Sequence, residues 1–169
     1  MHRLLRQIVS VFTGRYGRRP TAKSIKRIVA YMRDGSCHIH STHVTKSGIP
    51  VFARPCVEFR FDDPDERIAS VIHECISGCR DGLPDVKDFK GHLREMLSCF
   101  NAKSWRDLVF RRTSVGIDQC EGVLIFTPLT NEGAKGGYAG KRELERRLPI
   151  DSTPEAIAEA LRSAFADSD

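Results

Sequence analysis

The sequence predicts an α+β protein in which an antiparallel sheet is flanked by helices. Its 169 residues are 40% hydrophobic and 29% charged, a size and composition that support one domain with a buried core. Strand-like runs occur in adjacent pairs joined by short turns, which favours antiparallel pairing, and amphipathic helical stretches separate the pairs. We therefore expect one domain over residues 1–169, with the element order α-β-β-α-α-β-β-(β)-α.

The first third of the chain is predicted to hold a helix and a strand pair. The helix is expected from Thr21, a plausible N-cap, to Gly35. It is predicted because apolar residues recur at helical spacing, namely Ile25, Ile28, Val29 and Met32. Strands over 37–45 and 49–61 follow, and Pro55 inside the second indicates an edge or bulged strand.

The middle of the chain is predicted to be helical. The run Asp63-Pro64-Asp65-Glu66 places an N-cap residue before a proline and a glutamate three residues later, which indicates a helix start. Apolar residues then keep helical spacing as far as Gly82. A second helix is expected over 88–100, and Ser104 indicates a short helical turn.

The last third is predicted to contain a strand pair and a closing helix. Strands are expected over 112–119 and 122–129 around a tight turn. The glycine-rich residues 131–141 are expected to be a loop, followed by a short strand within 142–148. Residues 152–165 combine a capping start with an amphipathic pattern and indicate the final helix.

Charge is distributed unevenly along the chain. Residues 1–33 hold nine of the 27 Lys and Arg residues and no acid, so residues 34–169 hold 18 bases against 22 acids, a net charge of −4. A basic N-terminal arm over 1–33 therefore precedes a mildly acidic body. Such an arm is typical of a phosphate-contacting surface, here with Phe12 and Tyr16 interleaved, or of a solvated helix face.

The cysteines indicate a reducing compartment. The six cysteines are far below the density of a disulfide-stapled scaffold. The N-terminus is interrupted by Arg6 and lacks a small-residue cleavage site, which argues against a secretory signal, and no apolar run is long enough to span a membrane. We expect a soluble protein with reduced and mostly buried thiols.

Three histidines in the first predicted strand are the strongest candidates for a metal site. On a strand, His38 and His40 point to one face and His43 to the other. A catalytic zinc usually needs three protein ligands, and no third one is evident. We therefore expect no metal and an ordinary, partly exposed strand, while a small metal-dependent enzyme centred on His38 and His40 remains an alternative.

The sequence contains none of the common catalytic or cofactor-binding motifs. It lacks a nucleophile elbow, a phosphate-binding loop and a dinucleotide-binding fingerprint. The run His73-Glu74-Cys75 with Cys79 departs from the zinc deaminase pattern, because its glutamate is adjacent to the histidine and both cysteines fall on the apolar side of one helix. We expect no catalytic residue and no cofactor.

Several short motifs together resemble a known family. They are Phe12-Thr13-Gly14-Arg15-Tyr16-Gly17-Arg18-Arg19-Pro20-Thr21, Gly48-Ile49-Pro50-Val51-Phe52, Lys103-Ser104-Trp105, Phe126-Thr127-Pro128, and Ala158-Glu159-Ala160-Leu161 before Phe165. In this order and spacing they resemble the immunity proteins of bacterial contact-dependent growth inhibition systems, the CdiI group.

The resemblance implies a non-enzymatic inhibitor in the bacterial cytoplasm. Such proteins bind the C-terminal toxin domain of a CdiA effector, often a nuclease, and so protect the producing cell. The family has no catalytic motif, and no functional residue can be transferred by position. The main alternative from another class is a nucleic-acid-binding protein that uses the basic N-terminal segment.

If the partner is a nuclease, acidic residues are expected to face its cationic groove. Acids cluster between positions 62 and 88, and we set aside Asp63 and Glu66 because helix capping explains them. The remaining candidates for partner binding are Asp62, Asp65, Glu74, Asp81, Asp85 and Asp88. The alternatives are a merely solvated acidic segment and an interface on the glycine-rich 131–141 loop.

Overall fold

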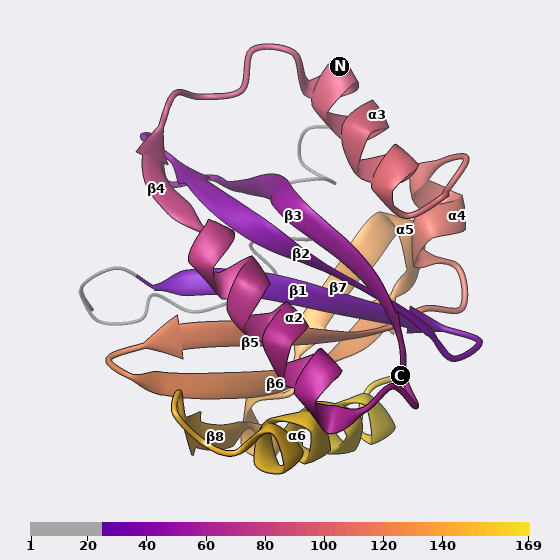
Figure 1. Ribbon diagram of the computed structural model, residues 1–169. Helices are drawn as coiled ribbons and strands as arrows, with labels where there is room; N and C mark the ends of the chain where they lie inside the picture. The colour runs from indigo at the N-terminus through magenta and orange to yellow at the C-terminus, as the bar shows by residue number, and fades with distance from the viewer. Residues whose placement is uncertain (1–24) are drawn as a thin grey trace.

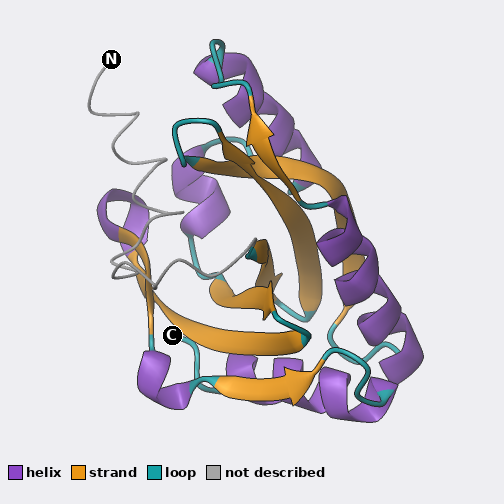
Figure 2. Ribbon diagram, turned by 90° about the vertical axis from the view of Figure 1, so that its left-hand side faces the viewer, coloured by secondary structure: helices purple, strands orange, loops and turns teal. Residues whose placement is uncertain are grey.

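A curved eight-stranded sheet with helices on both faces forms the protein (Figures 1 and 2). The computed structural model describes residues 25–169. The strand order is β3-β2-β1-β5-β6-β7, with β4 beside β2 and β8 beside β6. Neighbours on this path pair antiparallel, whereas β4 runs parallel to β2. The predicted α+β class is confirmed.

The elements alternate between strand pairs and helices. The strands are β1 (Lys26–Arg33), β2 (Ser36–Thr45), β3 (Pro50–Arg60), β4 (Arg80–Leu83), β5 (Thr113–Cys120), β6 (Val123–Glu132), β7 (Gly137–Gly140) and β8 (Arg146–Pro149). The helices are α2 (Asp65–Gly78), α3 (Phe89–Cys99), α4 (Trp105–Val109), α5 (Gly133–Gly136) and α6 (Pro154–Ala166), with a 3-10 turn at Arg142–Leu144.

Strand β1 lies where the sequence predicted the first helix, so that prediction is wrong for residues 25–35, while its start at Thr21 lies outside the described residues. Ile28 and Ala30 pack in one core cluster, and Val29 and Tyr31 pack in another on the opposite face. A strand buried on both faces reads as a continuous apolar run without alternation. Such a run also contains the helical spacing from which the helix was predicted.

The end of α2 and the glycine-rich segment also differ from expectation. The helix was predicted to continue to Gly82, but it stops at Gly78 and β4 follows. A side chain at position 78 would collide with Pro55 and Ser41, so the helix ends where it meets β2 and β3 closely. Residues 131–141 were expected to be a loop, yet they form α5 and β7, which pairs with β6.

Strand β3 is the edge strand that Pro55 predicted. It lies at one end of the strand order. Its pairing with β2 shifts register where His40 pairs with Cys56 and Ser41 pairs with Ala53, which leaves the cis-linked Arg54 and Pro55 as extra residues. A bulge at this point accommodates a residue that cannot donate to the ladder.

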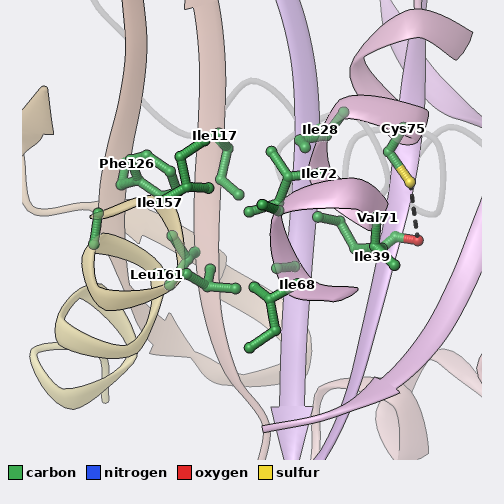
Figure 3. Close-up of a cluster of buried hydrophobic side chains, with 14 of the residues drawn as sticks. Ile28, Ile39, Ile68, Val71, Ile72, Cys75, Ile117, Phe126, Ile157 and Leu161 are labelled. Carbon is green, nitrogen blue, oxygen red and sulfur yellow. Dashed lines mark hydrogen bonds between the residues drawn. The ribbon is translucent and has the colours of Figure 1, made fainter. Parts of the chain in front are cut away.

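Two hydrophobic clusters occupy opposite faces of the sheet. The larger one joins the sheet to α2 and α6, with Ile72 and Ile157 fully buried among residues of β1, β2, β5 and β6 (Figure 3). The smaller one joins it to α3, α4 and β7 around Tyr31 and Phe100. None of the helices in residues 25–169 has the length and apolarity that crossing a membrane requires.

Helix starts follow the predicted capping chemistry except at α2. Asp88, Ser104 and Thr153 each accept a hydrogen bond from a backbone N–H of the first turn of α3, α4 and α6. Asp63 does not cap α2, contrary to prediction, because its carboxylate accepts from the backbone N–H of Arg60 at 2.9 Å. Asp63 therefore closes the turn that leads into α2.

We predict that Ile72→Ala lowers the free energy of unfolding by about 2–5 kcal/mol, because it leaves a cavity in the larger cluster. Glu74→Ala, on the exposed side of the same helix, serves as the control and should change it by less than about 0.5 kcal/mol. Urea denaturation followed by circular dichroism measures both. Equal values for the two variants would show that α2 does not bury this face.

Candidate functional site

The six acidic residues proposed for partner binding lie at two separate ends of α2. Asp62 and Asp65 flank its N-terminus, whereas Asp81, Asp85 and Asp88 follow its C-terminus around β4. Because α2 has 14 residues, these ends are about 20 Å apart. Glu74 lies in the last turn and a half of α2, so we group it with the second set. We call Glu74, Asp81, Asp85 and Asp88 the β4-side acids.

The two acids at the α2 N-terminus have partners within the chain. Asp62 accepts a hydrogen bond from Arg60 Nε at 3.1 Å, and this bond holds the pKa of the Asp62 carboxyl below its usual value. Asp65 accepts from an Arg162 guanidinium nitrogen at 2.7 Å. The bond between Asp65 and Arg162 links α2 to α6, so Asp65 stabilises the packing of these two helices.

Two of the β4-side acids also stabilise local structure. Asp85 accepts from the Ser47 hydroxyl at 2.6 Å, and this bond lowers the pKa of the Asp85 carboxyl. It anchors the β2–β3 turn to the segment after β4. Asp88 caps α3 through the Gly91 N–H at 2.9 Å. Both residues are exposed to solvent.

Glu74 and Asp81 are the exposed β4-side acids outside these caps and turns. Exposed carboxylates of this kind attract a basic surface and speed its encounter, while contributing little energy as isolated pairs. The same segments carry four bases, Lys46, Arg80, Lys87 and Lys90, so the surface is of mixed charge.

Two of the three described bases of the basic segment, Arg27 and Arg33, are tied to carboxylates; the third is Lys26. Arg27 donates to Asp118 through Nε at 2.6 Å and through a second nitrogen at 3.0 Å. Arg33 lies 3.5 Å from an Asp107 oxygen. Both arginines belong to β1 and not to a helix. The remaining bases of the arm, at positions 3–23, lie outside the described residues.

A layer of histidines lies between β2 and α3. His38 and His40 are 6% and 0% exposed, so the prediction of a partly exposed strand is wrong for them. The His38 ring centroid is 5.4 Å from that of Phe100, and the His40 ring is 5.0 Å from Phe52. Phe52 in turn contacts His92 of α3. Helix α3 covers this part of the sheet, which buries both rings.

Burial sets the protonation state of this layer. Desolvation lowers the pKa of His40 to about 4, and it lowers the pKa of His38, His43 and His92 as well. For His38, Glu58 opposes this effect from 3.8 Å. No cluster of three or more His, Cys, Asp or Glu within residues 25–169 could hold a metal ion. The neutral rings act as packing groups.

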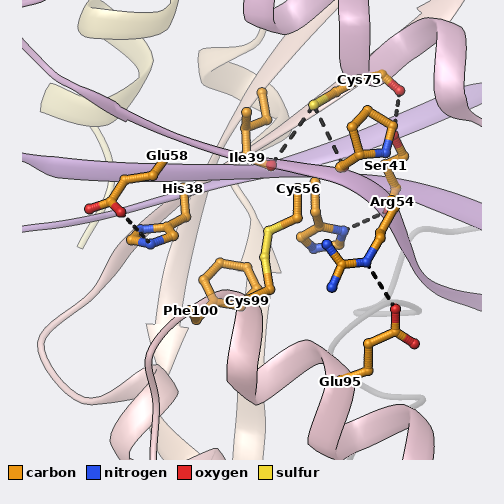
Figure 4. Close-up of a disulfide and its surroundings, with 12 residues drawn as sticks. His38, Ile39, Ser41, Arg54, Cys56, Glu58, Cys75, Glu95, Cys99 and Phe100 are labelled. Carbon is orange, nitrogen blue, oxygen red and sulfur yellow. Dashed lines mark hydrogen bonds and ion pairs between the residues drawn. A yellow bond between two sulfur atoms is a disulfide. The ribbon is translucent and has the colours of Figure 1, made fainter.

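A disulfide joins α3 to the edge strand, contrary to the expectation that all six cysteines are reduced. Cys56 of β3 and Cys99 of α3 are bonded across a separation of 43 residues, with their Cα atoms 6.5 Å apart (Figure 4). An ion pair between Arg54 and Glu95 at 3.1 Å lies beside it. Cysteines so far apart in the sequence give no local signal of pairing.

The other four cysteines are free thiols. Cys37, Cys75 and Cys79 are buried, as the sequence predicted. Burial raises the pKa of Cys37 and Cys75 to about 12, which keeps both thiols protonated. Cys75 also contacts the backbone oxygen of Ile39 (Figures 3 and 4). These thiols are core residues.

Sequence reasoning missed one further residue with unusual surroundings. Arg112 is 4% exposed, and its guanidinium carbon lies 5.5 Å from the centre of the Phe100 ring. It was predicted only as the first residue of a strand. An arginine at a strand end is ordinarily exposed, so nothing in the local sequence could have indicated its burial.

Comparison with known proteins shows what this fold resembles. No protein-family model and no curated protein matches the chain in sequence. A protein of unknown function from Neisseria meningitidis, NMB0488, is similar in structure, with a TM-score of 0.71 and 14% identity over 90% of this chain and all (100%) of that one.

A second solved structure is also similar. It is a chain of the CdiA-CT/CdiI toxin and immunity complex from Yersinia pseudotuberculosis, with a TM-score of 0.70 and 13% identity over 88% of this chain and 99% of that one. The described fold thus has the architecture of a chain from a toxin–immunity complex. At these identities the likeness concerns the fold.

We predict that acid destabilises the protein through His40. In the folded protein the pKa of His40 is about 4, below the ordinary value of 6.5. The neutral ring therefore makes its full contribution to the free energy of unfolding above pH 6.5, and this contribution is lost as the pH falls towards 4. Between pH 7.5 and 5.0 this amounts to about 2 kcal/mol. Urea titrations at both pH values should show the loss in the wild type and in His73→Gln, an exposed control. The loss should be smaller by that amount in His40→Gln, and an unchanged pH dependence in that variant would contradict the assignment.

We predict that the disulfide contributes about 2–4 kcal/mol to the free energy of unfolding, given the length of the loop it closes. The double variant Cys56→Ser with Cys99→Ser should lose this amount, whereas Cys120→Ser, a free half-exposed cysteine, should lose little. Thiol titration of unreduced denatured protein should find four free thiols. Six free thiols in protein purified under air would show that the bond does not form.

Proposed function

We propose that the protein is an immunity protein that binds and neutralises the C-terminal toxin domain of a CdiA-type effector. The observation that carries this proposal is the fold shared with a chain of the Yersinia toxin–immunity complex, over 88% of this chain and 99% of that one. The sequence motifs resemble the CdiI group, which favours the immunity component. In this role the protein is a non-enzymatic inhibitor in the cytoplasm of the cell that makes it.

The β4-side acids are the proposed contact surface for the toxin. A nuclease binds phosphates through a cationic groove, and carboxylates can occupy the positions that phosphates would take. Glu74 and Asp81 are exposed at the end of α2 and the start of β4. Asp85 and Asp88 add charge beside them although they also stabilise turns. Asp62 and Asp65 lie too far away to share one small contact.

The experiment is co-expression with a candidate CdiA-type toxin domain. Induction of the toxin alone should arrest growth, and induction with this chain should restore it. The two purified proteins should also co-elute from a size-exclusion column. Growth arrest that persists with soluble chain present, together with separate elution, would contradict the proposed function.

We predict that Glu74→Gln with Asp81→Asn slows association with the toxin domain by about 3- to 30-fold at low salt, because electrostatic steering depends on such charges. The control Glu155→Gln with Glu159→Gln removes two exposed charges from α6 and should leave the rate nearly unchanged. Stopped-flow binding measures both. Equal rates for the two variants would move the interface away from the β4-side acids while leaving the proposed function intact.

A further inference from the structure

Arg112 is a buried cation that forms no direct ion pair within residues 25–169, although the Asp107 carboxylate is within electrostatic range. It is 4% exposed, stacks against Phe100, and donates one hydrogen bond, to the Phe100 backbone oxygen at 3.2 Å. Its Nε has no hydrogen-bond partner within residues 25–169. Among the ion pairs of that part of the chain, none includes Arg112.

A second cation and an imidazole face the same space. His38 also packs against Phe100, and neither of its ring nitrogens has a hydrogen-bond partner in the described chain. Glu58 approaches it at 3.8 Å. In the strand register Tyr31 pairs with His38 and Met32 pairs with Thr113, so Arg33, Arg112 and His38 lie near one another at the same end of three neighbouring strands. The positive charges of Arg112 and Arg33 accordingly help to lower the pKa of His38.

The two nearby carboxylates of the described chain already have partners. Glu58 accepts a hydrogen bond from the Ser36 hydroxyl at 2.8 Å, and Asp107 is shared by two groups. Asp107 Oδ1 lies 3.5 Å from Arg33, at the limit of a hydrogen bond, and Oδ2 accepts from the Lys103 N–H at 2.8 Å. Residues 1–33 contain no Asp or Glu, so the segment before β1 has no side-chain carboxylate to contribute.

Buried polar groups are nearly always partnered, and an unpaired buried charge is among the most unfavourable features a fold can keep. We propose that Arg112, Arg33 and His38 form a binding site for a carboxylate group from outside this chain. A guanidinium matches a planar carboxylate in shape as well as charge. The site adjoins solvent through Arg33 and Asp107, whose side chains are 31% and 35% exposed. This inference does not depend on the proposed function.

The pKa of the His38 imidazole reports whether a carboxylate is bound. A carboxylate beside it should raise its pKa by about one unit, as an opposite charge at short range does. The experiment follows the His38 ring by NMR in the isotopically labelled full chain, with its signal assigned from a His38→Gln variant. It compares pH titrations in sodium acetate with titrations in sodium chloride of equal ionic strength. We expect a rise in acetate and none in chloride.

Arginine variants test which residues hold the anion. Arg112→Met should abolish the response to acetate without lowering the melting temperature of the acetate-free protein, since a merely structural arginine would lower it. Arg106→Met removes an exposed cation of neighbouring α4 and should keep the response. If Arg112→Met fails to fold, Arg33→Gln, at a half-exposed position, replaces it and should weaken the response at least threefold.

The acetate concentration distinguishes the source of the carboxylate. Saturation at low millimolar acetate identifies a site for a free small carboxylate. Saturation only at hundreds of millimolar identifies a site for an Asp or Glu side chain that a bound partner supplies at high effective concentration. A His38 pKa that is the same in acetate and chloride overturns the proposal, as does an acetate response that Arg33→Gln leaves intact.

Discussion

Burial of β1 on both faces is the constraint on which the rest of the structure depends. The strand pairs with β2 on one side and β5 on the other, and alternate residues enter two different cores. Ile28 and Ala30 face the cluster that includes α2 and α6, whereas Val29 and Tyr31 face the cluster that includes α3 and α4. A register shift of one residue would exchange these sets, so the pairing of β1 fixes both layers at once.

The two layers differ in chemistry. The α2–α6 layer is apolar, with three protonated thiols among aliphatic side chains. The α3–α4 layer contains aromatic rings, neutral histidines and a buried arginine. Helix α3 buries a single residue, Met96, within its length, and the disulfide and the Arg54–Glu95 pair fasten it to β3. The buried histidines and the buried arginine therefore lie in the layer whose main helix, α3, buries only one of its own residues.

Elements with one buried and one exposed face were predictable from the sequence. Features that depend on contacts between distant segments were not. Helices α2 and α6 each bury one stripe of side chains, and α3 has a partly buried apolar side, so apolar spacing identified all three. The β5–β6 hairpin was equally clear from its tight turn. Strand β1 was misread as a helix because burial on both faces removes the alternation that identifies a strand.

The same reasoning explains the outcome for the candidate site. The acidic residues were visible in the sequence, but their division between the two ends of α2 depends on where the helix begins and stops. The Cys56–Cys99 bond, the burial of His38 and the isolation of Arg112 all follow from α3 folding over the sheet. No spacing within the chain could indicate that docking.

The central claim is that this fold serves to hold a toxin domain, and amide hydrogen exchange tests it most directly. Exchange is measured by mass spectrometry for the chain alone and for the chain mixed with a candidate CdiA-type toxin domain. The account predicts slower exchange over the last turns of α2 and over β4, around Glu74 and Asp81, with the β8–α6 side unchanged. Identical exchange in every peptide, with and without the toxin domain, would contradict it.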